Sequence, residues 1–215
     1  MAYTTIDDPS VYFQAKIYSG NGGSQAITND GNSDLQPDWA WFKKRSGSES
    51  HALFDTSRGI DRFVIADTDA VEQHQPTTGN TDADDIASFN SDGFTFQGGG
   101  GAINQSSNTY VAWQWKANGG TTASNTDGNL TTTVQANQDA GFSIVLWTST
   151  GSSDTIGHGL GATPSIIMEK SRSASGAFTF FTNKGGNKLL FLNNTNTVTT
   201  SFSGVSNVGS SIFTD

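Results

Sequence analysis

Pro37-Asp-Trp-Ala-Trp-Phe-Lys43 decides the fold of this chain, because a stretch of the same character, Pro164-Ser-Ile-Ile-Met-Glu-Lys170, follows about 128 residues later. The segments before them also correspond. Phe13-Gln-Ala-Lys-Ile-Tyr18 leads to the first stretch, and Phe142-Ser-Ile-Val-Leu-Trp147 leads to the second. Because aromatic, apolar, glycine, proline and lysine positions recur in one order, the sequence predicts two copies of one β unit.

The alignment of the two copies predicts which residues take equivalent places. We expect the copies to superpose with Trp41 on Met168 and with Tyr18 on Trp147. Within the first copy, residues 39–43 and 51–55 are apolar runs separated by a polar Ser-Gly-Ser turn. This pattern predicts a β-hairpin that pairs the two runs.

The second copy lacks the last strand of the first. The first copy continues to Tyr110-Val-Ala-Trp-Gln-Trp-Lys116, whereas the second reaches only Ser211-Ile-Phe-Thr-Asp215. A bare apolar strand edge is rarely tolerated. We therefore expect either that the chain continues beyond residue 215 or that a neighbouring subunit supplies the strand. In both cases residues 139–215 alone should be unstable, while residues 1–118 should fold.

The composition is typical of an all-β protein. Only 33% of the 215 residues are hydrophobic and 14% are charged, yet the chain has 14 Phe, 5 Trp and 4 Tyr that need burial. No segment has helical periodicity beyond a turn or two. We predict two β-sandwich or jelly-roll-like units in tandem, the second of them incomplete. The expected boundaries are 1–118, a Gly/Thr/Asn-rich linker over 119–138, and 139–215.

Charge and cysteine content exclude several classes of partner and site. A net charge of −9 disfavours nucleic acid and anionic membranes as partners. The chain has no cysteine, which excludes disulfides and thiolate metal sites. Its first residues do not have the pattern of a signal peptide, and no stretch has the length of a membrane span, so we expect synthesis in the cytoplasm and no membrane insertion.

The carboxylates and histidines are the side chains that could act as catalytic or metal-binding groups. Glycoside hydrolysis needs two carboxyl groups about 5–10 Å apart. The glutamates are Glu49, Glu72 and Glu169, and the match of Glu169 with Phe42 indicates an outward strand position for Glu169. We expect no catalytic residue among them. The histidines are too scattered for zinc, and His158, between two glycines, is expected to cap a turn.

Two sets of residues remain as binding candidates. Five aspartates have oxygen ligands of the kind that calcium prefers, although a solvated acidic loop is the stronger explanation for them; they are Asp67, Asp69, Asp82, Asp84 and Asp85. Five tryptophans offer ring faces that stack on sugars, or else they fill the core; they are Trp39, Trp41, Trp113, Trp115 and Trp147. No other cofactor is indicated.

Several motifs together resemble one known group of proteins. Residues 35–45, 50–59, 88–94, 110–116 and 157–164 are similar to motifs of marine bacteriophage proteins, of the type found in phages of cyanobacteria and other pelagic bacteria. Such proteins are described as tail fibres or virion appendages with lectin-like, concanavalin-type sandwiches.

The resemblance implies a virion structural protein that is made in the host cytoplasm and released by lysis. It implies other virion proteins as partners, recognition of host surface glycans, and no catalysis. A symmetric oligomer is expected, because polar, Gly-rich β chains without disulfides gain stability from burial against identical neighbours. The resemblance implies that this oligomer is a homotrimer. Two alternatives remain open: a glycan-degrading enzyme of the virion, and a capsid decoration protein.

Overall fold

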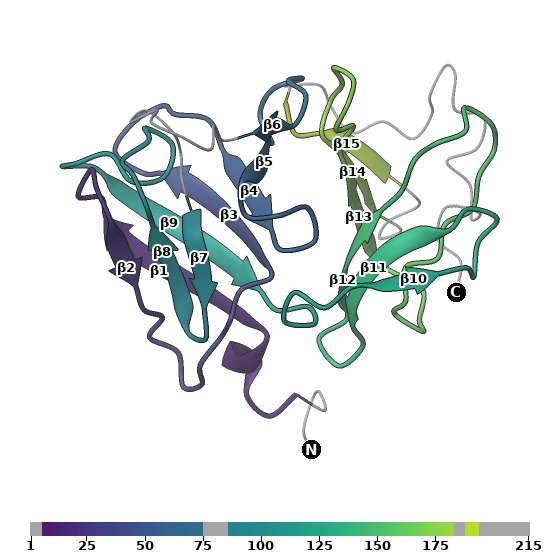
Figure 1. Ribbon diagram of the computed structural model, residues 1–215, viewed down its shortest axis with the longest axis horizontal. Coiled ribbons are helices and arrows are strands. Elements are labelled where there is room, and N and C mark those ends of the chain that lie inside the picture. Colours follow the sequence, from purple (N-terminus) through teal and green to yellow (C-terminus); the bar gives the residue numbers. More distant parts are fainter. Residues whose placement is uncertain (1–5, 75–85, 183–187, 194–215) are drawn as a thin grey trace.

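Antiparallel β-sheets make up the protein in the computed structural model, which describes residues 6–74, 86–182 and 188–193 (Figure 1). The predicted all-β class is confirmed. One 3-10 helix, η1 (Pro9–Val11), precedes the strands. The strands are β1 (Phe13–Ser19), β2 (Gln25–Ile27), β3 (Trp39–Lys44), β4 (Ala52–Asp55), β5 (Arg62–Ile65), β6 (Gln73–His74), β7 (Ile86–Asn90), β8 (Gly93–Phe96), β9 (Thr109–Trp115), β10 (Ala123–Asn125), β11 (Thr132–Asn137), β12 (Phe142–Leu146), β13 (Ile166–Glu169), β14 (Thr179–Thr182) and β15 (Lys188–Phe191).

The first unit is a sandwich of two sheets. The larger has the order β1-β9-β3-β4-β5-β6, and the smaller has the order β2-β8-β7. Every second residue of β3 and β9 is buried, as the period-two pattern requires. Phe42 of β3 contacts Phe94 of β8 edge to face, with ring centroids 5.1 Å apart. Such contacts between the sheets form the core of the unit.

The second unit contains two three-stranded sheets, β10-β11-β12 and β13-β14-β15. β10 and β11 lie within residues 119–138, so the prediction of a weakly structured linker there is wrong. The reason is Gln135, a fully buried side chain that no hydrophobic pattern reveals. Within the described residues, no helix is long and apolar enough to cross a membrane.

Strand registers agree with the alignment of the two copies. In the first unit, Trp41 of β3 pairs with Leu53 of β4, which pairs with Val64 of β5. In the second, Met168 of β13 pairs with Phe180 of β14, which pairs with Leu190 of β15.

Each unit also has the same backbone hydrogen bond just after the third of these paired strands, β5 in the first unit and β15 in the second. Ala66 N donates to His51 O, and Leu192 N donates to Phe178 O. Trp41 and Met168 are therefore equivalent, as are His51 and Phe178, and Ala66 and Leu192. The match of Tyr18 with Trp147 stays a prediction.

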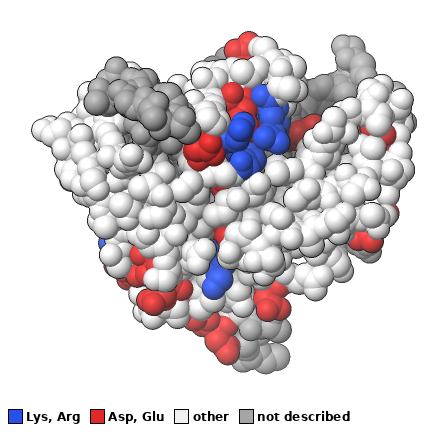
Figure 2. All heavy atoms as spheres, in the orientation of Figure 1, with Lys and Arg blue, Asp and Glu red and all other residues white. Residues whose placement is uncertain are grey.

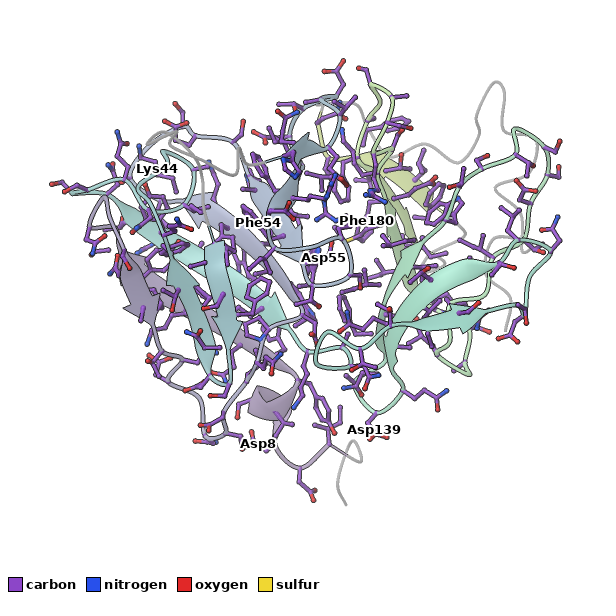
Figure 3. All side chains as sticks on the ribbon, in the orientation of Figure 1. Asp8, Lys44, Phe54, Asp55, Asp139 and Phe180 are labelled. Carbon is purple, nitrogen blue, oxygen red and sulfur yellow. The ribbon has the colours of Figure 1, made fainter. Side chains whose placement is uncertain are left out.

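The two units meet through the face of the larger sheet that points away from the first core. Leu53 and Val64 are buried there against Phe178 of the second unit. Partly buried apolar side chains complete this junction cluster: Trp39, Trp41, Met168 and Leu192. Figure 3 shows Phe54 on the sheet of the first unit and Phe180 on the facing sheet of the second. The part of the larger sheet formed by β3, β4 and β5 is thus covered on both faces.

Asp38 and Gln135 fix the crossing between the units with buried hydrogen bonds. The Asp38 carboxylate accepts from the backbone N–H groups of Ala117, Gly119 and Gly120, at 2.7–2.9 Å. Gln135 Oε1 accepts from Gly120 N at 2.9 Å, and Gln135 Nε2 donates to the hydroxyls of Thr56 and Ser57. Residues 117–120, which connect the two units, therefore form a rigid corner.

An ion cluster that is centred on the largely buried carboxylate of Glu72 ties the units together. Glu72 of the first unit bonds to Arg172 of the second, and Arg62 and Arg58 lie within ion-pair distance of the same carboxylate. Burial opposes ionisation of Glu72, but the arginines outweigh it and hold the pKa of this carboxyl below its ordinary value. Figure 2 shows basic and acidic atoms grouped in the upper middle of this face, on an otherwise mostly uncharged surface.

The predicted outward position of Glu169 is wrong. Phe42, its counterpart, is fully buried in the first core, because Trp41 on the same strand points to the junction and its neighbour must point the other way. Glu169 is itself partly buried, and burial raises the pKa of its carboxyl. The second unit thus places an ionisable group where the first unit has a core phenylalanine.

We expect Glu169→Gln to raise the melting temperature at neutral pH. A carboxyl whose folded pKa is raised stabilises the fold below its unfolded pKa and loses that contribution as pH rises through the folded pKa. Melting curves of both proteins should therefore coincide below the ordinary glutamate pKa and separate above it. A constant difference at every pH would contradict this origin.

Candidate functional site

Four of the five tryptophans lie together on the junction face of the larger sheet. Trp39 and Trp41 of β3 are paired in register with Trp115 and Trp113 of β9. The ring centroids of Trp39 and Trp115 are 4.6 Å apart, and those of Trp41 and Trp113 are 6.1 Å apart. All four are only partly buried. Trp147 follows β12 in the second unit, and no ring contact joins it to this group in the described part of the chain.

A cleft opens beside this aromatic group, at the junction between the units. Its volume is about 170 Å³, and its lining comes from both units: Trp41, His51, Ala66, Asp67 and Leu192. β3 supplies the tryptophan, the residues just before β4 and just after β5 supply the polar groups, and the turn after β15 closes the far side. Residues distant in sequence thus form one small, mostly apolar hollow with a polar rim.

His51 is fixed by two of its neighbours. Trp41 Nε1 donates to His51 Nδ1 at 2.8 Å, and His51 N donates to Asp67 Oδ1 at 2.9 Å. Burial lowers the pKa of the imidazole; the charge of Asp67 opposes this effect and that of Lys43 adds to it. The imidazole is therefore neutral at pH 7. Because Nδ1 accepts, the proton lies on Nε2, which is available as a donor.

The cleft combines the groups that recognise a neutral polar ligand. The Trp41 indole gives a flat apolar surface, His51 Nε2–H gives a donor, and the exposed Asp67 carboxylate gives acceptors. Sugars carry both an apolar ring face and hydroxyl groups that donate and accept. The arrangement is therefore suited to binding one or two sugar units.

The aspartates predicted as calcium ligands do not form a cation site in the described residues. Asp67 accepts from the His51 backbone, and Asp69 accepts from the hydroxyl of Ser175 at 3.1 Å. Asp82, Asp84 and Asp85 lie outside the described residues. Among the residues that the structure describes, no three acidic or histidine side chains are placed to hold a metal ion.

Two glutamates and the two histidines other than His51 make contacts away from the cleft. Glu49 is exposed, and its Oε1 lies 3.8 Å from Lys44 Nζ. Glu72 belongs to the ion cluster. His158 Nδ1 accepts from Leu160 N at 3.2 Å, so the predicted turn cap is confirmed. His74 pairs with Asp61 at 2.7 Å. None of these groups lines the cleft.

His51 lines the cleft, and the sequence did not single it out. The hairpin predicted for residues 39–55 places it on the strand next to Trp41, and this was the one available signal. Asp67 and Leu192 join the cleft only through the packing of one unit on the other.

The comparisons with known proteins identify a family but not an activity. No curated protein and no solved structure matches the chain. A family model described as a domain of unknown function, DUF7483, matches residues 8–214. Because this match spans both units, the protein belongs to the DUF7483 family.

Proposed function

We propose that this protein is a non-catalytic, glycan-binding component of a bacteriophage virion, in the role of a tail fibre or similar appendage. The junction cleft is its sugar site, and other virion proteins and identical copies, as a homotrimer, are its partners. The observation that carries the binding function is the cleft of Trp41, His51 and Asp67. The similarity of the sequence motifs to phage appendage proteins supports the place in the virion.

The electrostatics of the carboxyl groups support binding without catalysis. A glycosidase acid needs a raised pKa and a second carboxyl group close by. Glu72 has its pKa lowered by arginines, and Asp67 is an exposed carboxylate beside a neutral imidazole. Glu169 does have a raised pKa, but it is not among the residues that line the cleft.

The binding function is tested with the full chain on a printed array of host-type oligosaccharides and polysaccharides. We expect selective binding that Trp41→Ala weakens about tenfold or more, because loss of an aromatic ring removes its stacking surface. His51→Phe should abolish the polar contact and leave the fold intact, since the second unit has Phe178 at the equivalent place.

Trp147→Ala is the matched control, because this aromatic side chain lies outside the cleft. It should leave binding unchanged. Absence of binding on the array, or binding that both cleft variants retain, would contradict the proposal. Release of new reducing ends from a bound polysaccharide would instead favour the enzyme alternative.

The place in the virion is tested by antibody labelling of particles that carry the chain. We expect label at the tail or at an appendage. Label spread over the capsid at a stoichiometry near the capsid copy number would favour the decoration alternative.

A further inference from the structure

β9 is the central strand that joins β1 to β3 in the first unit. It pairs along its whole length with β1 on one side and with β3 on the other. Its Trp115 lies between two aromatic side chains, with ring centroids 4.7 Å from Phe13 and 4.6 Å from Trp39. Without β9, the edges of β1 and β3 would both be open and Trp39 would lose its cover.

The second unit has the expected neighbours of such a strand in separate sheets. The sequence alignment of the two copies matches β12 with β1, and the strand registers match β13 with β3. Within the described residues, β12 pairs only with β11 and β13 pairs only with β14. Because β14 takes the side of β13 that β4 takes on β3, the remaining edge of β13 is the one that β9 occupies on β3.

The exposed side chain of Ile166 also supports this edge of β13 as the place of a further strand. Ile166 of β13 is equivalent to Trp39, and its side chain is 53% exposed. Of the described residues, only Phe13, Ile17, Val71 and Ile166 are large hydrophobic residues classed as exposed. Since Trp115 covers Trp39 in the first unit, a strand paired in the equivalent place would carry an aromatic ring over Ile166.

We propose that the edges of β12 and β13 form an acceptor slot for a β-strand supplied by a partner chain. The strand has the character of β9, with large aromatic side chains at alternate positions, one of which covers Ile166. Backbone hydrogen bonds along the two edges provide the affinity, and the aromatic alternation provides the specificity. This interaction uses a surface that is separate from the junction cleft, so it does not depend on the glycan function.

The probe is a fluorescently labelled peptide with the sequence of residues 108–117, added to the full chain and followed by anisotropy. We expect saturable binding. The same peptide with Trp115→Ala should bind about tenfold or more weakly, because the ring that covers Ile166 is gone. In the protein, Ile166→Asp should weaken binding by a similar factor without lowering the melting temperature, since the side chain is exposed.

Hydrogen exchange locates the bound peptide. Protection should increase over residues 142–147 and 166–169. β1 serves as the internal control, because it is the edge strand of the larger sheet. The proposal is overturned if the peptide does not bind, or if neither substitution weakens its binding. It is also overturned if the peptide protects β1 in place of β12 and β13.

Discussion

Asp38→Ala should cost the protein about 3–5 kcal/mol of its free energy of unfolding, because a fully buried carboxylate and its charge-assisted bonds are lost together. Three backbone N–H groups, those of Ala117, Gly119 and Gly120, lose their shared acceptor. The Thr56 hydroxyl, 3.1 Å from the same carboxylate, loses a partner as well. Water cannot replace these bonds without opening the corner between the units.

The measurement is chemical denaturation of the full chain. Asp30→Ala is the matched control, because Asp30 is an exposed aspartate whose ion pair with Lys16 contributes little. Asp38→Asn should also be destabilising, since an amide presents one acceptor oxygen where the carboxylate presents two. A loss below about 1 kcal/mol for Asp38→Ala would show that the corner is held by other contacts.

Phe42→Ala should cost about 3–5 kcal/mol as well, by leaving a cavity at the centre of the first sandwich. The Phe42 ring is fully buried and contacts Phe54, Phe94 and Phe96, with centroids 5.1–5.8 Å apart. These contacts link the larger sheet to the smaller one, so their loss loosens both.

Thermal and chemical unfolding of Phe42→Ala and Phe13→Ala make the comparison. Phe13 is also a strand phenylalanine, but it is 39% exposed, so its removal should cost less than about 1.5 kcal/mol. Equal losses for the two variants would contradict a core centred on Phe42.

Much of the fold followed from the sequence because its strongest signals are local. The alternation in residues 110–115 predicts a strand with Trp113 and Trp115 on one face, and β9 has that arrangement. The order of motifs predicted the repeat, and the strand registers agree with it.

Other parts depended on contacts that no local pattern records. The polar residues 119–138 resembled a linker because Gln135 is buried by hydrogen bonds and not by hydrophobicity. The sequence predicts the tryptophans as binding candidates, but the cleft also needs Leu192 from a distant segment, and the sequence does not reveal how the second unit packs on the first. The outward assignment of Glu169 failed because the position of its equivalent, Phe42, on the core face became known only from the packing.

The junction between the units brings equivalent residues of the two copies together. Trp41 and its counterpart Met168 belong to one apolar cluster, and Leu192 lines the same cleft as its counterpart Ala66. Surfaces that meet their own equivalents are the mark of a twofold-symmetric homodimer. The two units of this chain meet in the same way, since equivalent residues of both copies lie at their junction.

Because one chain carries both units, their association is independent of protein concentration. This arrangement also allows the halves to diverge, because each copy of the interface residues can change alone. His51 and Phe178 are such a pair, because His51 lines the polar cleft and its equivalent Phe178 is buried in the apolar cluster.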